Sequence, residues 1–304
     1  MSNKSKIQHQ MREASARAGG SHATRRARVA SIRIFVAALF SLGFPITCIE
    51  QIGVRAIAAF VALRQQARKS LRTIQNDLSF IRTILRVAGR EQFARDPLIS
   101  NKSLGISGAS RRGTKKAPTD NEYINILHHA EDPGLKALLM LARWLGLRAQ
   151  EAILSVASLK QWRKALESGR TDILVVRGTK GGRPRSVRVF NIVEGLNAID
   201  SALFVIATGR KLAPKADLKG AVKWLSNAAS RLEVQFHSLR YRYAQDAVHT
   251  LLGEGHSVPA ACAMVGMYLG HGDGRGRMVK AVYCRHLIRE KTSLPSNPPM
   301  FSGG

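Results

Sequence analysis

One β element interrupts a chain whose apolar spacing is otherwise helical. The runs ILVVRGTK and RSVRVF flank Gly181 and Gly182, and a glycine turn between two β-branched runs predicts a hairpin. Elsewhere apolar residues recur every three or four positions, as in Ile74, Leu78 and Ile81, which indicates one-sided helices. The sequence therefore predicts a mainly α fold with a small β-sheet, the α+β part lying in the second half of the chain.

The charge balance points to a polyanionic partner. The 304 residues hold 48 Lys and Arg against 20 Asp and Glu, a net charge of +28. Such an excess repels itself unless nucleic acid neutralises it, and it is spread along the chain instead of being confined to one membrane-binding helix. The three cysteines form no CxxC pair, which excludes an obvious zinc site or disulfide framework and predicts a cytoplasmic, nucleoid-associated protein.

One uncharged stretch, Ile34 to Ile49, follows a basic start as a membrane span can. It is shorter than the roughly 20 residues that a span needs, and Gly43 and Pro45 break it. We therefore interpret it as a buried core helix that ends at a Gly-x-Pro turn, and we expect no membrane partner.

Composition and periodicity divide the chain into five segments. Residues 1–25 are expected to form a flexible basic arm, residues 26–95 a helical DNA-binding domain, and residues 96–118 a basic linker rich in Ser and Gly. Residues 119–290 form the second domain and residues 291–304 a C-terminal tail. Basic side chains in these segments are candidate phosphate contacts: Arg68, Lys69, Arg72, Arg82, Arg86, Arg111, Arg112, Lys115, Lys116, Arg183 and Arg185.

Six further polar residues suit metal-free cleavage of a phosphodiester. They are Arg148, Lys180, His237, Arg240, His271 and Tyr283. A nucleophile must retain the bond energy as a covalent ester, fixed cations must stabilise the developing negative charge, and a proton must reach the departing 5′ oxygen. Arginine forks suit the second role because they are always charged and bind two oxygens at once.

Local spacing assigns roles within this set. Glu151 follows Arg148 by three residues, so it can hold the guanidinium or pair with the local backbone; for that pair alone a surface ion pair is the simpler interpretation. His237 and Arg240 are also three apart and share a helix face. Lys180 precedes the hairpin turn, where an ammonium can act as general acid or make a nonspecific phosphate contact.

The motifs resemble those of the tyrosine recombinases, the phage integrase family. GLRAQE resembles the first-arginine box, TKGGRPRSVRV the hairpin-lysine segment, HSLRYRYAQDAV the histidine–arginine box and YLGHG the second-histidine box, in a divergent integrase branch. Two departures stand out. Tyr283 follows His271 by twelve positions, a longer spacing than is usual in the family, with GDGRGR as a short insertion. The histidine common two residues after the tyrosine is replaced by Arg285.

The resemblance implies a core-binding domain followed by a catalytic domain that holds the six residues as its catalytic set, with Glu151 in support. It implies a site-specific recombinase that forms a 3′-phosphotyrosyl intermediate and integrates or excises a mobile element, without metal or cofactor. The implied partners are double-stranded DNA at specific recombination sites, three further copies in a synaptic tetramer, and accessory DNA-bending or excision factors.

Three other interpretations remain open on sequence alone. A type IB topoisomerase uses much the same residues, although the small N-terminal domain and short tail favour a recombinase. A DNA-binding accessory protein that has lost catalysis would show erosion of the charged set, and none is seen. A metal-dependent nuclease needs clustered carboxylates, which the few acidic residues do not supply.

Overall fold

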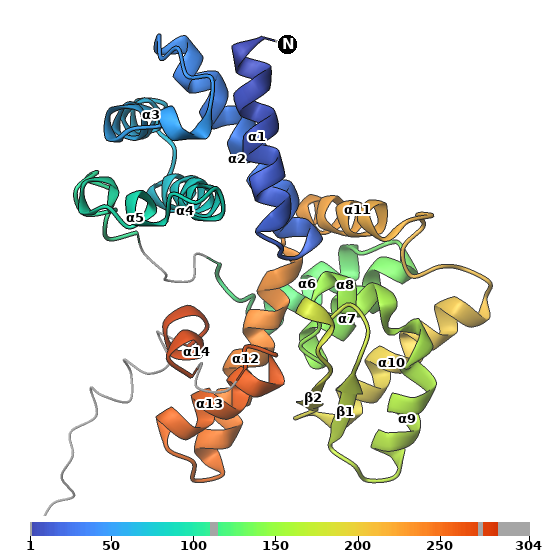
Figure 1. Ribbon diagram of the computed structural model, residues 1–304. Coiled ribbons are helices and arrows are strands. Elements are labelled where there is room, and N and C mark those ends of the chain that lie inside the picture. The colour runs from blue at the N-terminus through green and yellow to red at the C-terminus, as the bar shows by residue number, and fades with distance from the viewer. Residues whose placement is uncertain (1, 110–114, 273–275, 285–304) are drawn as a thin grey trace, which may run out of the picture. The chain divides into compact units, whose positions relative to one another are not determined.

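The computed structural model describes residues 2–109, 115–272 and 276–284, and it divides the chain into two compact units. The first unit covers Met1–Ser110 and the second Arg111–Gly304, and each has its own hydrophobic core. Helices dominate both, and the sheet found among the described residues has two strands (Figure 1). The predicted fold class, mainly α with a small β-sheet, is confirmed.

The first unit is helical throughout its described residues, 2–109. Its helices are α1 (Asn3–Arg17), α2 (His22–Ser41), α3 (Val54–Gln66), α4 (Leu71–Val87) and α5 (Glu91–Ala94), with the short 3-10 turns η1 (Ile49–Gln51) and η2 (Pro97–Ile99). The uncharged stretch from Ile34 lies largely in α2, which buries Phe35, Val36 and Leu39 in the core. None of the described helices is long and apolar enough to cross a bilayer.

The expectation of a flexible arm over residues 1–25 is wrong where α1 forms. Ser2 caps the helix by accepting a hydrogen bond from the Ser5 backbone N–H at 3.2 Å. Ile7, Met11 and Ala14 are fully buried, and their spacing of four and three residues is that of one helix face. The rest of the segment is polar and highly charged, so this narrow apolar stripe was not recognised as a helix face in the sequence.

The expected linker also begins too early. Ile99 and Ile106 are fully buried in the core of the first unit. Arg82 of α4 donates to the backbone oxygen of Ile99 and, at 3.1 Å, to Asn101 Oδ1. Residues 96–109 therefore belong to the first unit, and the guanidinium group of Arg82 makes hydrogen bonds within that unit. Arg111 and Arg112 lie outside the described residues, as does the predicted tail, 291–304.

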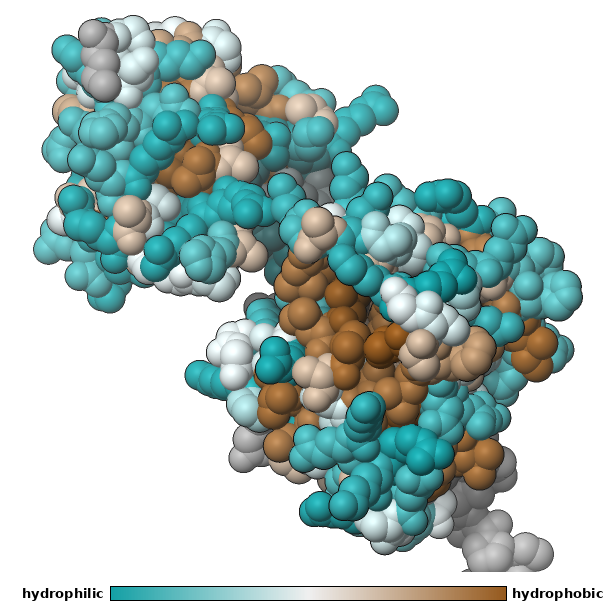
Figure 2. Space-filling model, turned by 90° about the vertical axis from the view of Figure 1, so that its right-hand side faces the viewer, coloured by the Kyte–Doolittle hydropathy of each residue, from teal (hydrophilic) through white to brown (hydrophobic). Residues whose placement is uncertain are grey.

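The second unit packs helices around the hairpin. Its helices are α6 (Asp120–His129), α7 (Pro133–Trp144), α8 (Ala149–Leu154), α9 (Leu159–Glu167), α10 (Ile192–Ala207), α11 (Leu218–Arg231), α12 (Phe236–Gly253), α13 (Val258–Tyr268) and α14 (Gly276–Val282), with 3-10 turns η3 (Ser155–Ala157) and η4 (Lys180–Gly182). The apolar helix α7 lies at the centre and packs against α10 and α12. On the face seen in Figure 2, apolar side chains gather in a patch bordered by hydrophilic ones.

The predicted hairpin is confirmed. Strands β1 (Asp172–Val175) and β2 (Arg185–Arg188) pair antiparallel, with Asp172 opposite Arg188 and Val175 opposite Arg185. Between them, Gly181 and Gly182 have φ of 76° and 71°, a left-handed conformation that glycine adopts without steric cost. The turn carries Lys180 at its start. Helix α9 packs beside β1 and supports the hairpin (Figure 1).

Candidate active site

Arg148 precedes α8 as its N-cap residue and is held by Glu151. The Glu151 carboxylate accepts the Arg148 backbone N–H through Oε2 and the side-chain Nη1–H through Oε1, both at 2.7 Å. The three-residue spacing creates both contacts because it places a carboxylate at the third position of the helix. Since Glu151 is fully buried, this is not the surface ion pair that the two residues alone would suggest.

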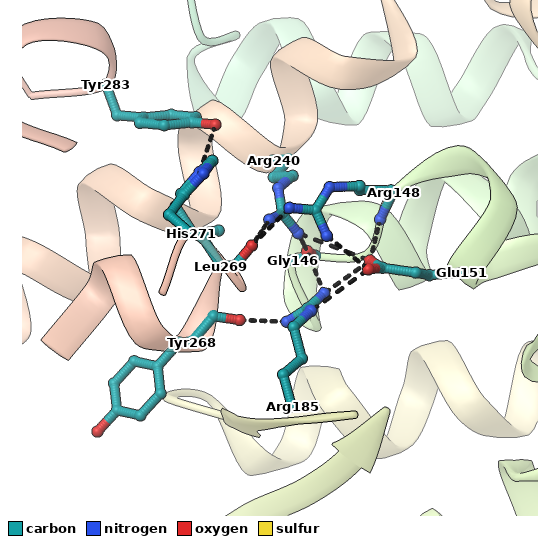
Figure 3. Close-up of polar contacts among 9 residues, drawn as sticks. All are labelled: Gly146, Arg148, Glu151, Arg185, Arg240, Tyr268, Leu269, His271 and Tyr283. Carbon is teal, nitrogen blue, oxygen red and sulfur yellow. Dashed lines mark hydrogen bonds and ion pairs between the residues drawn. The ribbon is translucent and has the colours of Figure 1, made fainter. Parts of the chain in front are cut away.

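Two more guanidinium groups reach the same carboxylate. Arg185 donates Nη2–H to Glu151 Oε2 at 2.7 Å, and Arg240 Nη1 lies 3.7 Å from that oxygen. Figure 3 shows the three guanidinium groups converging on the carboxylate. We refer to Arg148, Glu151, Arg185 and Arg240 as the Glu151 cluster. Three positive charges and one negative charge leave it an excess of positive charge.

Backbone carbonyl groups fix the arginines of the cluster. Arg240 donates to the carbonyl oxygens of Gly146 and Leu269, and Arg148 Nη2 donates to the Leu269 oxygen at 2.7 Å. Gly146 has φ of 57°, and a Cβ atom there would lie 2.6 Å from the Tyr243 ring. The glycine of the GLR motif therefore lets the backbone approach α12 closely enough to accept the Arg240 hydrogen bond.

Arg185 differs from its expected role as a phosphate contact. It is 7% exposed and also donates to the carbonyl oxygen of Tyr268, so its guanidinium group is committed within the protein. The alternation of a strand explains this position, because Arg185 and the fully buried Val187 point to the same face of β2. That period-two signal was present in RSVR and could have identified Arg185 as an inward-facing residue.

The cluster keeps its carboxylate ionised. Burial by itself would raise the pKa of Glu151, but the hydrogen bond and charge of Arg185, the charge of Arg240 and the Arg148 backbone N–H together lower that pKa to about 2. Burial lowers the pKa of Arg240, which the charge of Glu151 opposes. The single carboxylate thus offsets part of the positive charge of three guanidinium groups in a place where unpaired charges would be costly.

Both predicted histidines lie beside this positive charge and are neutral at pH 7. Burial, and then the charge of Arg240, lower the pKa of His237 and that of His271 to about 4. A neutral imidazole ring has one nitrogen that accepts a hydrogen bond. The site therefore offers proton acceptors instead of two more cations.

Tyr283 follows α14 and is 3% exposed. Its hydroxyl lies 3.2 Å from His271 Nε2, within hydrogen-bond distance, and Figure 3 shows the phenol directed toward the ring nitrogen. With the ring proton on Nδ1, the Tyr283 hydroxyl donates a hydrogen bond to His271 Nε2. The longer chain between the two residues therefore still brings them together.

The other tyrosines of this region pack against neighbouring rings. The Tyr243 hydroxyl donates to the Arg188 carbonyl oxygen at 2.7 Å, and its ring meets Phe190 edge-on. Tyr268 also meets Phe190 edge-on, and its hydroxyl points away from the Glu151 cluster (Figure 3). Tyr241 is different because its ring centroid lies 4.4 Å from that of Tyr283, a contact that could not be predicted from sequence spacing.

A cavity of about 1050 Å³ joins these groups. The predicted catalytic residues that line it are Arg148, Lys180, His237, His271 and Tyr283. Arg240 is absent from the lining because it is fully buried beneath it. Lys180 and Arg183, on the exposed hairpin turn, complete one wall. The sequence therefore identified a set of residues that the fold brings to one place.

The remaining predicted phosphate contacts fall into two groups. Arg68, Lys69, Arg86, Lys116 and Arg183 are exposed, although Lys116 pairs with Glu122 at 3.3 Å. Arg72 donates to the Ala109 carbonyl oxygen at 3.1 Å within the first unit. Lys115 is partly buried, which lowers its pKa, and it lines a smaller cavity together with His237.

Two family models match the chain, and together they cover most of it. Residues 4–94 match the phage integrase N-terminal domain and residues 105–246 match the integrase domain. The chain belongs to the phage integrase family of tyrosine recombinases. Because the second match ends at residue 246, the positions of His271 and Tyr283 in this integrase rest on the geometry described above. No curated protein matches in sequence.

Solved structures share the fold at low sequence identity. A Tn1549 transposon integrase in complex with transposon right-end DNA has a TM-score of 0.63 at 13% identity, over 93% of this integrase and 99% of that chain. A lambda integrase tetramer bound to a Holliday junction has a TM-score of 0.57 at 16% identity, over 89% and 75%. A lambda integrase dimer bound to a core site gives 0.56 at 15% identity, over 96% and 79%.

Proposed function

We propose that this integrase is a site-specific DNA recombinase that cuts DNA through Tyr283 and forms a 3′-phosphotyrosyl intermediate. The observation that carries the proposal is the hydrogen bond between Tyr283 and His271 in a cavity beside the positively charged Glu151 cluster. A nucleophile, a neutral proton acceptor and fixed cations are thereby together, as transfer of a phosphoryl group requires.

The proposed step conserves one phosphodiester bond. The Tyr283 oxygen bonds to the scissile phosphorus while its proton passes to His271 Nε2, and the bond from phosphorus to the 5′ oxygen breaks. The departing 5′ oxygen takes a proton from Lys180, whose exposed ammonium lines the same cavity. Attack by the 5′ hydroxyl of another strand reverses the step and joins the DNA without water, metal or ATP.

The Glu151 cluster would stabilise the charge that develops on the phosphate oxygens. Arg148 lines the cavity with 22% of its side chain exposed, so it can contact a phosphate oxygen directly. Arg240 contributes its charge from beneath, and its Nε–H has no hydrogen-bond partner among the described residues. Because the arginines are already held by carbonyl groups and Glu151, little reorganisation accompanies the reaction.

The proposed partners follow from charge and fold. A net charge of +28 suits double-stranded DNA, and the related solved structures include DNA complexes. Exchange between two duplexes needs four active sites, so we propose a tetramer on paired recombination sites, in line with the lambda integrase tetramer. The similarity in fold to a transposon integrase supports a role in moving a mobile element, and we propose that this integrase acts on DNA in the cytoplasm.

The test begins with a library of nicked duplexes of randomised sequence, in which cleavage releases a short strand and traps the covalent adduct. Wild-type protein is incubated with the library, and the DNA that stays attached on a denaturing gel is sequenced. We refer to the recovered duplex as the selected duplex. Tyr283→Phe is expected to bind it normally and to form no adduct, because only the nucleophilic oxygen is removed.

Tyr268→Phe is the matched control, since it removes another phenolic oxygen at the rim of the same cavity. It is expected to form the adduct at the wild-type rate. An adduct that persists in Tyr283→Phe would assign the nucleophile to another residue. Wild-type protein that binds DNA but yields no adduct would favour a DNA-binding accessory protein instead of an enzyme.

A further inference from the structure

Three side chains repeat along one face of α12, at intervals of four residues. His237, Tyr241 and Gln245 each lie about one turn after the previous one, so they form a stripe along the helix. We refer to these three residues as the α12 stripe. Tyr241 is 5% and Gln245 8% exposed, and both contact Tyr283.

The Tyr241 ring contacts two groups of the proposed active site. Its centroid is 4.4 Å from that of Tyr283, with the rings inclined by 52°. It also meets the His237 ring edge-on at 5.7 Å. The second distance is that of a favourable aromatic pair, and the first is a close ring contact. The ring therefore acts as a spacer that sets how far the phenol of Tyr283 lies from α12.

Gln245 holds the backbone at the same residue. Its Nε2–H donates to the Tyr283 carbonyl oxygen at 2.9 Å, a buried hydrogen bond. A buried carbonyl group left without a donor costs free energy, so this bond favours one placement of the chain after α14. Hydroxyl, ring and backbone of Tyr283 are thus each held by a different residue: His271, Tyr241 and Gln245.

We propose that the α12 stripe is a docking platform for the nucleophile, in which Tyr241 and Gln245 are positioning residues that orient Tyr283. The effect on cleavage rests on the proposed function, whereas the docking of Tyr283 does not. Orientation has catalytic value because an error of about 1 Å in placing a reacting group can cost about 10²-fold in rate. The same helix supplies Arg240 and His237. One rigid element therefore fixes the position of the groups that stabilise the phosphate and the position of the nucleophile.

The test compares three variants of the full-length protein. Tyr241→Leu removes the aromatic ring, and Tyr241→Phe keeps the ring and removes only the hydroxyl. Tyr123→Leu is the matched control, because Tyr123 is also 5% exposed and also lies edge-on to an aromatic ring, that of Trp144 at 6.1 Å, outside the cavity. Thermal unfolding of each variant sets the assay temperature well below every melting point.

The first readout needs no DNA. Tetranitromethane nitrates exposed tyrosines, and mass spectrometry of the peptide that contains Tyr283 reports its rate of modification. We expect nitration of Tyr283 to be several-fold faster in Tyr241→Leu than in wild type, and unchanged in Tyr241→Phe and Tyr123→Leu. Equal protection in Tyr241→Leu and wild type would overturn the docking proposal, whatever the enzyme does with DNA.

The second readout is the single-turnover rate of adduct formation on the selected duplex at saturating protein. Tyr241→Leu should lower that rate by about 10- to 10²-fold with unchanged DNA affinity, and Tyr241→Phe should restore it. Faster nitration with an unchanged cleavage rate would overturn the positioning role. A wild type without any adduct would remove the proposed function and leave the nitration result standing.

Gln245→Leu provides a second variant of similar size that removes the amide group, and with it the donor to the Tyr283 carbonyl oxygen. It provides the test of the platform should Tyr241→Leu fail to fold. We expect the same pattern with a smaller amplitude, faster nitration of Tyr283 and slower adduct formation. Wild-type behaviour of Gln245→Leu in both readouts would exclude the amide from the platform.

Discussion

The second unit places its positive charges in two contrasting ways. In the Glu151 cluster, Arg148, Arg185 and Arg240 are held by a buried carboxylate and by backbone carbonyl groups. On the hairpin turn, Lys180 and Arg183 are exposed, and no ion pair or hydrogen bond of their side chains is found within the described part of the chain. The contrast suggests a division of labour in which fixed charges stabilise a transition state, while free charges follow the DNA or deliver a proton.

Removal of the Glu151 carboxylate should have the largest effect on the contrast between fixed and exposed charges. Glu151→Gln should lower the free energy of unfolding by about 3–5 kcal/mol, because it leaves buried guanidinium groups without their counter-charge. It should also abolish adduct formation. Urea unfolding measures the first effect, and the selected duplex measures the second.

The matched control is Glu254→Gln, which removes a carboxylate bound to Arg188 at 2.7 and 2.9 Å on the exposed side of the hairpin. Exposed ion pairs contribute little, so stability and cleavage should stay near wild type. If both substitutions lowered stability and cleavage equally, the buried carboxylate would contribute no more than the carboxylate of a surface ion pair.

A substrate with a better leaving group separates the two kinds of charge. Lys180→Ala and Arg148→Ala should each slow adduct formation, the latter by at least about 10²-fold, as expected for loss of one preorganised donor. A 5′-bridging sulfur leaves without protonation, so it should largely restore the Lys180→Ala rate and leave Arg148→Ala slow. A failure to rescue Lys180→Ala, combined with weaker DNA binding, would reassign that lysine to simple phosphate contact.

The dependence of stability on acid pH distinguishes the buried histidines from the buried carboxylate of Glu151. The pKa values of His237 and His271 are lowered to about 4 by burial, so they contribute stability above pH 6.5 that is lost as pH falls toward 4. The pKa of Glu151 is about 2, so its contribution is retained near pH 4.5 and is lost only as pH falls further toward 2. Urea midpoints at pH 7, 5 and 3 should therefore decline in two stages.

His271→Gln provides the control for that titration. It should flatten the decline between pH 6.5 and 4, because one of the two histidines no longer binds a proton on unfolding. The later decline, which belongs to Glu151, should remain. A profile identical to that of wild type would exclude His271 as a contributor.

Sequence reasoning was better at identifying side chains that the fold brings together than at placing the boundaries of the segments. Arg148, His237 and Arg240 could be identified from the sequence because local spacing determines which neighbouring side chains lie together. The fold then brings these separate segments into one place. Arg185 was misassigned because a count of positive charges ignored the inward alternation of its strand. The flexible arm was misjudged because three buried residues of α1 are few beside its charges.

Contacts between distant segments could not be predicted in this way. The ring contact between Tyr241 and Tyr283 joins α12 to the residue that follows α14. The Gly146 carbonyl oxygen accepts a hydrogen bond from Arg240, which lies 94 positions later in the sequence. Neither contact follows from spacing, because each depends on how closely two distant segments of the chain pack. Burial of Arg240 is likewise a tertiary property, and it places that arginine beneath the cavity instead of on its wall.

The smallest expected effect concerns Arg183, on the exposed side of the comparison. If its guanidinium group contacts one phosphate, Arg183→Ala should weaken binding to all duplexes alike and make the slope of log affinity against log salt shallower by about 0.9. The cleavage rate at saturating protein should not change, because the Glu151 cluster is untouched. Titrations of the selected duplex and of a scrambled duplex at several salt concentrations measure the slope. A loss confined to the selected duplex would instead make Arg183 a reader of base sequence, and the exposed turn would then carry specificity as well as charge.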